Sequence, residues 1–185
     1  MVNYFLIDLE LNIFKINFKI LFFPDIHCYD INQINRKKAM FDIIHQIGVK
    51  SKPENIYQLL TTDEGLSQWW TKDTQGAGDI GSMIEFKFNE IGLQFEVSKL
   101  IANKKVVWKH KGSVPEAWMG TEIVFNLIEE DKQTLVRFNH QNWSQSSDFM
   151  AHCCTKWAVF LLSLKDAVEK GEGNPFPNDV QIDHS

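Results

Sequence analysis

Apolar and polar residues alternate in short runs along most of the chain after residue 40, a pattern typical of β-strands with one buried face. The first run covers residues 43–49 and places Ile43, His45, Ile47 and Val49 on one face. Five later runs are separated by short polar turns, so we expect neighbouring strands to pair as an antiparallel meander. These five runs are Met83–Phe88, Leu93–Ile101, Val106–His110, Thr121–Ile128 and Thr134–His140.

Two short helices are expected between the first and second runs. Ser51 and Glu54 have the spacing of a capping box, and Pro53 suits the first turn of a helix. Thr62 begins a second short helix, which ends in the pair Trp69-Trp70.

The longest amphipathic segment predicts a helix that is capped by Ser147 or Asp148, runs to about Lys170 and is ended by Gly171. Its apolar residues recur at intervals of three and four and form one stripe along the helix, and Ser163 lies outside this stripe. Because such a stripe must be buried, we expect this helix to pack on the apolar face of the sheet. The stripe consists of Met150, Cys153, Cys154, Trp157, Leu161, Leu164 and Val168.

Composition changes near Met40, before which Phe, Ile, Asn, Lys and Tyr dominate. Two interpretations remain open for residues 1–39: a non-native, weakly ordered extension ahead of a natural start at Met40, or a real extension that adds a strand or two. We therefore divide the 185 residues into an N-terminal extension (1–39), one α+β domain (40–175) and a tail (176–185). A hydrophobic fraction of 44%, with fourteen Phe and six Trp, is enough for one substantial core.

Charge and cysteine content exclude several classes of partner. A formal net charge of −5 argues against nucleic acid and anionic membranes as partners. The apolar stretch 4–23 is interrupted by charged residues, so we expect neither a signal peptide nor insertion into a membrane. Three cysteines, two of them adjacent at Cys153 and Cys154, form no disulfide framework and fit the reducing cytoplasm.

Two short motifs resemble cofactor or metal sites but lie in the wrong context. The G-x-G-x-x-G string at 76–81 leads into a strand rather than a helix, so it does not match a dinucleotide-binding loop. His152, Cys153 and Cys154 are consecutive in a helix, where neighbouring side chains diverge by about 100° and do not readily share one ion. We expect no cofactor and no metal.

Five segments, taken in order, resemble the START-like (SRPBCC) superfamily, and within it the branch of activator-of-Hsp90-ATPase homologues. They span nearly all of the chain after residue 40. The segments are IGVKSKPENIYQLLTTDEGLSQWW (47–70), FEVSKLIANKKVVWKH (95–110), GTEIVFNL (120–127), TLVRFNHQNW (134–143) and KWAVFLLSLKDAVEKGEGNPF (156–176).

This resemblance implies a helix-grip fold of the START/Bet v 1 type, in which a curved antiparallel sheet wraps around a long C-terminal helix. It also implies a cavity between sheet and helix that holds an apolar small molecule such as a lipid, a polyketide or an aromatic compound. A co-chaperone role is not implied, because these residues contain no counterpart of the second domain of that co-chaperone.

Alternation along the strands and the helical stripe select the residues expected to line this cavity. They are Trp70, Phe86, Phe88, Phe95, Trp108, His110, Ile123, Phe125, Phe138, His140, Met150, Cys153, Trp157 and Leu161.

Three functions stay open at this stage. The first is binding of an apolar ligand. The second is a cyclase- or hydrolase-type reaction that uses His45, His110 or His140 as acid or base. The third is a contact with a protein partner such as a chaperone, through the outer face of the sheet or the region Trp69–Gly81, with the interior filled by close-packed aromatic side chains. A homodimer formed through a sheet edge stays open as well.

Overall fold

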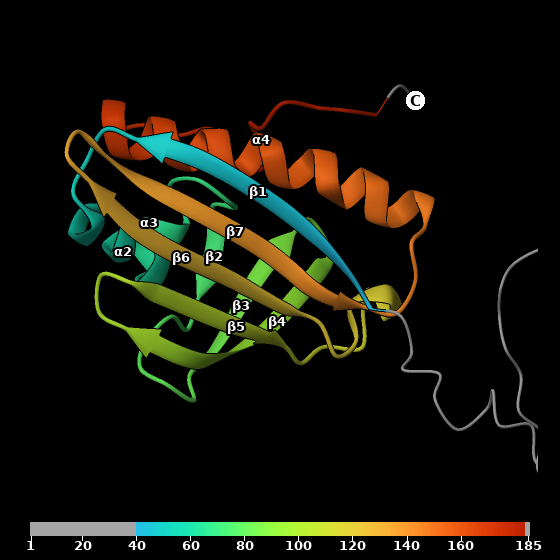
Figure 1. The fold of residues 1–185 in the computed structure, drawn as a ribbon. Coiled ribbons are helices and arrows are strands. Elements are labelled where there is room, and N and C mark those ends of the chain that lie inside the picture. The colour runs from blue at the N-terminus through green and yellow to red at the C-terminus, as the bar shows by residue number, and fades with distance from the viewer. Residues whose placement is uncertain (1–39, 184–185) are drawn as a thin grey trace, which may run out of the picture. The chain divides into compact units, whose positions relative to one another are not determined.

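The computed structural model describes residues 40–183, so both interpretations of residues 1–39 fall outside the described part of the chain. A curved antiparallel sheet of seven strands has the order β1-β7-β6-β5-β4-β3-β2 (Figure 1). Its strands are β1 (Phe41–Val49), β2 (Asp73–Gln75), β3 (Met83–Phe88), β4 (Ile91–Ile101), β5 (Lys105–His110), β6 (Glu122–Glu130) and β7 (Gln133–Trp143). Each of the six alternating runs forms a strand, and only the three-residue β2 was not predicted.

The two short helices that follow β1 are α2 (Pro53–Thr61) and α3 (Asp63–Leu66). The predicted capping box is wrong, because α2 begins at Pro53 behind Lys52, and the hydroxyl of Ser51 accepts from the Asn55 side chain at 2.9 Å instead. Thr62 caps α3 as predicted, since its hydroxyl oxygen accepts from the backbone N–H of Gly65 at 3.0 Å.

The long C-terminal helix α4 (Asp148–Lys170) lies across one face of the sheet, beside β1 and β7 (Figure 1). Ser147 caps it through a 3.2 Å bond from the N–H of Met150, and Gly171 ends it with a positive φ of 80°. This arrangement confirms the helix-grip α+β fold. The buried side of α4 consists of Cys153, Trp157, Phe160, Leu161, Ser163, Leu164 and Ala167.

Ser163 corrects one detail of the predicted stripe. It is buried, and its hydroxyl accepts from the backbone N–H of Asn174 at 2.7 Å. The segment after α4 folds back over the helix, which brings this polar position under cover and gives it a partner.

Residues 171–183 return along α4 and are tied to the rest of the chain at several points. The backbone N–H of Phe176 donates to the carbonyl of Trp70 at 2.9 Å, and the N–H of Lys72 donates to the carbonyl of Phe176 at 3.1 Å. Further along, the carboxylate of Asp179 is buried against the ammonium group of Lys156. Among residues 40–183, none of the helices is both long enough and apolar enough to cross a bilayer.

Candidate functional site

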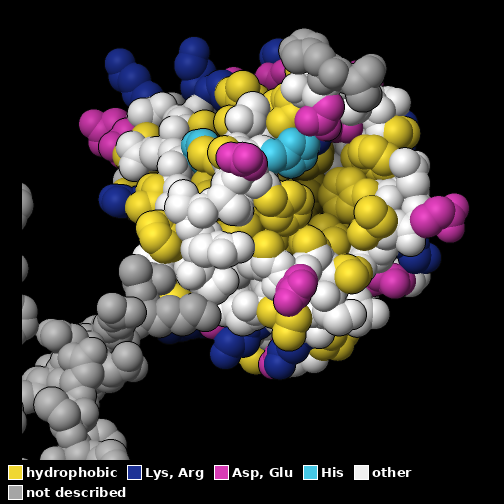
Figure 2. All heavy atoms as spheres, turned by 90° about the vertical axis from the view of Figure 1, so that its right-hand side faces the viewer, with side chains coloured by type: hydrophobic (Ala, Val, Ile, Leu, Met, Phe, Trp, Pro, Cys, Tyr) yellow, Lys and Arg dark blue, Asp and Glu magenta, His cyan; other side chains and the backbone are white. Residues whose placement is uncertain are grey.

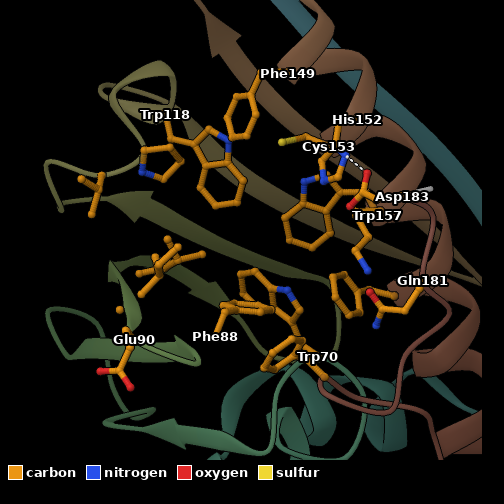
Figure 3. Close-up of a pocket in the computed structure, with 18 residues that line it drawn as sticks. Trp70, Phe88, Glu90, Trp118, Phe149, His152, Cys153, Trp157, Gln181 and Asp183 are labelled. Carbon is orange, nitrogen blue, oxygen red and sulfur yellow. Dashed lines mark ion pairs between the residues drawn. The ribbon is translucent and has the colours of Figure 1, made fainter. Parts of the chain in front are cut away.

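A cavity of about 610 Å³ opens where the β3–β4 turn faces the N-terminal half of α4 (Figure 2). Its wall is mostly aromatic, and we call it the aromatic cavity. Its lining residues come from the segment after α3, from β3 and the start of β4, from the connection between β5 and β6, from α4 and from the C-terminal segment (Figure 3). The seven rings are those of Trp70, Phe88, Trp118, Phe149, Trp157, Phe160 and Phe176.

The position of each ring follows from its element. Phe88 ends β3 immediately before a tight turn, in which Asn89 takes a positive φ of 54°. Phe149, Cys153, Trp157 and Phe160 follow one another on α4 at intervals of four and three residues, so they share one face of the helix. This face and the end of β3 form two walls of the aromatic cavity.

Two polar contacts between α4 and the C-terminal segment lie at one side of the aromatic cavity. Nδ1 of His152 lies 3.2 Å from a carboxylate oxygen of Asp183 (Figure 3). One turn further along α4, Lys156 pairs with Asp179, and its ammonium group lies 5.5 Å from the centre of the Phe160 ring. These pairs hold the C-terminal segment against α4. Glu90 and Gln181 are further polar residues of a wall that is otherwise mostly apolar.

Four of the residues selected from the sequence line the aromatic cavity: Trp70, Phe88, Cys153 and Trp157. The others lie elsewhere. Met150 is half-buried on α4, and the remaining side chains are buried in the interior beside the cavity or behind its wall, where they pack closely. These remaining residues are Phe86, Phe95, Trp108, His110, Ile123, Phe125, Phe138, His140 and Leu161.

His140 is fully buried behind the wall of the aromatic cavity. Its Nδ1 accepts from the indole N–H of Trp157 at 3.1 Å, and its Nε2 lies 2.9 Å from the hydroxyl of Thr121. That hydroxyl donates to the carbonyl of Trp118 at 2.7 Å, so it accepts from His140, and the ring is the neutral tautomer with its proton on Nε2. Burial, with a smaller contribution from nearby His110, lowers the pKa of His140 to about 3.

Each of the other two histidines contacts a backbone carbonyl through its Nε2 atom. Nε2 of His110 lies 3.2 Å from the carbonyl of Val114, and burial lowers the pKa of His110. Nε2 of His45 lies 3.0 Å from the carbonyl of Cys154. The three histidines therefore do not converge on a common point in the wall, and His110 and His140 instead support the segment that carries Val114 and Trp118.

Cys153 contributes a thiol to the wall, but burial raises its pKa to about 11. At neutral pH it therefore stays a protonated, weakly nucleophilic group that packs as a small apolar side chain. No group of three or more His, Cys, Asp or Glu side chains within residues 40–183 is arranged to hold a metal ion.

Several wall residues were missed by the sequence analysis. The spacing of Phe149 and Phe160 relative to Trp157 is a helical signal that was available in the sequence. Trp118 and Phe176 lie in connections without periodicity, where the sequence offers no comparable signal.

Known proteins resemble this chain in sequence and in fold. The model of a family described as "Activator of Hsp90 ATPase homolog 1-like protein" matches residues 50–169. The chain is similar to the Aha1 dimer from Colwellia psychrerythraea, with 61% identity over 72% of this chain and 99% of that one, and a TM-score of 0.68. No curated protein gives a significant match.

Two more distant structures share the fold. One is a protein from Staphylococcus saprophyticus, with 18% identity, coverage of 72% of this chain and 95% of that one, and a TM-score of 0.61. The other is CalU16 from Micromonospora echinospora, with 15% identity, coverage of 74% and 77%, and a TM-score of 0.59.

Proposed function

The chain belongs to the activator of Hsp90 ATPase homolog 1-like family, and within that family we propose that it binds an apolar small molecule in the aromatic cavity. One observation carries the proposal: a hollow of about 610 Å³ with a mostly apolar wall lies open to solvent beside α4. Small-molecule sites typically enclose about 300–1,000 Å³ and combine such walls with a few polar groups.

The rim of the aromatic cavity supports the same function. Ile91, Val114 and Phe149 line it and are 56%, 53% and 41% exposed. Clustered apolar side chains in contact with water are unfavourable, so a rim of this kind is typical of a surface that a ligand covers.

The polar groups of the wall favour binding over turnover. Lys156 and His152 are both engaged with carboxylates of the C-terminal segment, and the thiol of Cys153 is protonated. His110 and His140 lie outside the wall and hold it from behind, so the enzymatic alternative draws no support from the positions assigned to them.

A titration with the uncharged fluorescent probe N-phenyl-1-naphthylamine tests this proposal. We expect saturable binding to the wild-type protein, and at least about tenfold weaker binding to Phe149→Glu, because that carboxylate must be desolvated beside the probe. Leu162→Glu is the matched control, since Leu162 is also exposed on α4 but does not line the aromatic cavity, and it should bind within about twofold of wild type.

Two results would contradict the proposal: no saturable binding to the wild-type protein, or equal losses in the two variants. Native mass spectrometry of the purified protein is an independent test, because a bound apolar compound adds a discrete mass to the protein.

The 61% identity with a dimeric relative leads us to propose a homodimer as well. Sedimentation velocity over a range of concentrations should then give a species of twice the mass of the 21.5 kDa chain. A mass that stays monomeric at every concentration would refute it.

A further inference from the structure

The outer face of the sheet, turned away from α4, concentrates positive charge. Residues on β5 alternate, so that Val106, Trp108 and His110 point into the core while Lys105 and Lys109 point outward. Together with neighbouring strands they form a shallow hollow of about 510 Å³, lined by four cations and one carboxylate. Its net charge of +3 contrasts with −5 for the whole chain.

Strand register places three of these cations close together. Lys105 pairs with Asn126, and Asn126 pairs with Arg137, so Lys105 and Arg137 lie in one row, about 10 Å apart across two strand spacings. Lys99 pairs with Val107, two residues along β5 from Lys105, which is a diagonal separation of about 7–8 Å. We call Lys99, Lys105 and Arg137 the cationic triplet.

Among residues 40–183, the neighbouring carboxylates form no ion pair with the cationic triplet. Glu54 and Glu129 line a second hollow together with Arg137 without pairing with it. Glu122 pairs with Lys109 at 3.5 Å, and Glu96 pairs with Lys111 at 2.5 Å, both toward one end of the face. Within residues 40–183, no ion pair involves a member of the triplet. An anionic partner would therefore meet three cations that are not engaged in ion pairs within the described residues.

We propose that the cationic triplet is a docking site for an acidic segment of another polypeptide. Alternate residues of an extended chain lie about 7 Å apart on one side, which matches the diagonal spacing of Lys99 and Lys105. Asn126, Asn139 and Gln141 supply amide groups around the cations, as in polar protein interfaces.

The same face is poorly suited to nucleic acid or to a membrane. The only apolar residues that line the hollow are Val107 and Val124, and both are buried. Its lining therefore presents no aromatic ring for base stacking and no exposed apolar side chain for insertion into lipid. This site is independent of the aromatic cavity, because it lies on the opposite face of the sheet.

Fluorescence anisotropy with labelled decaglutamate tests the proposal. At about 50 mM salt we expect saturable binding of decaglutamate by the full chain, no binding of labelled decalysine, and a marked loss of affinity as salt is raised toward 0.5 M. The double variant Lys99→Glu/Arg137→Glu should bind decaglutamate at least about thirtyfold more weakly.

Lys132→Glu/Lys52→Glu is the matched control, because it makes the same change of charge at exposed positions outside the hollow. It should bind within about threefold of wild type, and circular dichroism should show that both variants are folded. Equal losses in the two double variants would overturn the proposal, as would the absence of decaglutamate binding to the wild-type protein. Tighter binding of an oligothymidylate of the same length would assign the face to nucleic acid instead.

Discussion

Two ends of the same interior are built from similar side chains, yet one is filled and the other is hollow. At the packed end, the rings of Phe125 and Phe138 are fully buried with centroids 5.3 Å apart, and Trp108 lies 5.1 Å from Phe125. At the cavity end, Phe88, Trp118 and Phe149 surround a space of about 610 Å³. Aromatic content alone therefore does not decide whether such an interior is filled.

The difference lies in what forms the walls. The packed end is closed by α4 and by adjacent strands of the sheet. These strands are separated only by the hydrogen-bonding distance between neighbours, so their inward side chains interdigitate with one another and with those of α4. The cavity end is closed by connections: the segment with Trp118, and the C-terminal segment with Phe176. Hydrogen bonds and ion pairs hold these connections in place, so they enclose space without filling it.

Trp157 contacts both ends, and its removal should have the largest effect. Its ring is 2% exposed, with centroids 4.5 Å from Phe138 and 4.9 Å from Trp70. We expect Trp157→Ala to lower the free energy of unfolding by about 3–5 kcal/mol in urea melts, because it leaves a void and removes the donor to His140. Leu162→Ala, at an exposed position on the same helix, should change it by less than about 0.5 kcal/mol. A loss below about 1 kcal/mol for Trp157→Ala would show that the ring is not packed as described.

Phe86 and Phe88 compare the two ends directly, because they lie two residues apart on β3. Phe86 is fully buried, with its ring 4.1 Å from that of Trp70, whereas Phe88 borders the aromatic cavity and is only half-buried. Phe86→Ala should therefore lower the free energy of unfolding by about 2 kcal/mol more than Phe88→Ala, since fewer contacts are lost beside empty space. Equal losses in urea melts would mean that the cavity end is packed in solution.

The sequence predicted the strands and α4 well, because their signals are local. Alternation along β5 and the three-and-four spacing on α4 each need only a few neighbouring residues. The pattern also shows which side chains face the interior, and it selected Phe86 and Phe88 alike. Whether an inward side chain meets another ring or open space depends on distances between elements, which periodicity does not contain.

Periodicity could not predict the parts of the cavity wall that are formed by connections between elements. Trp118 ends a single 3₁₀ turn (Glu116–Trp118) in the connection between β5 and β6, and Phe176 belongs to the residues that the sequence analysis assigned to a tail. The hydrogen-bond partners of Nε2 in His110 and His140 could not be predicted either, because these partners lie in the connection between β5 and β6. Alternation placed His110 and His140 on the inner face, but only the path of the β5–β6 connection shows that they bind it from behind.

The smallest predicted effect on the free energy of unfolding comes from the protonation of His140. This residue is buried behind the wall of the aromatic cavity, not at its exposed rim. Because its pKa is lowered to about 3 in the folded protein, the unfolded chain takes up a proton below about pH 6.5 while the folded protein does not. Stability from the neutral ring is thus fully present above pH 6.5 and is lost as pH falls toward 3. Between pH 7 and pH 5 the free energy of unfolding should fall by about 1–2 kcal/mol more in wild type than in His140→Asn, which lacks the titrating ring. The measurement is a series of urea melts at different pH values. If the free energy of unfolding depended on pH in the same way in both proteins, His140 would not be buried as a neutral ring, and its bonds to Thr121 and Trp157 would not hold the cavity wall in place.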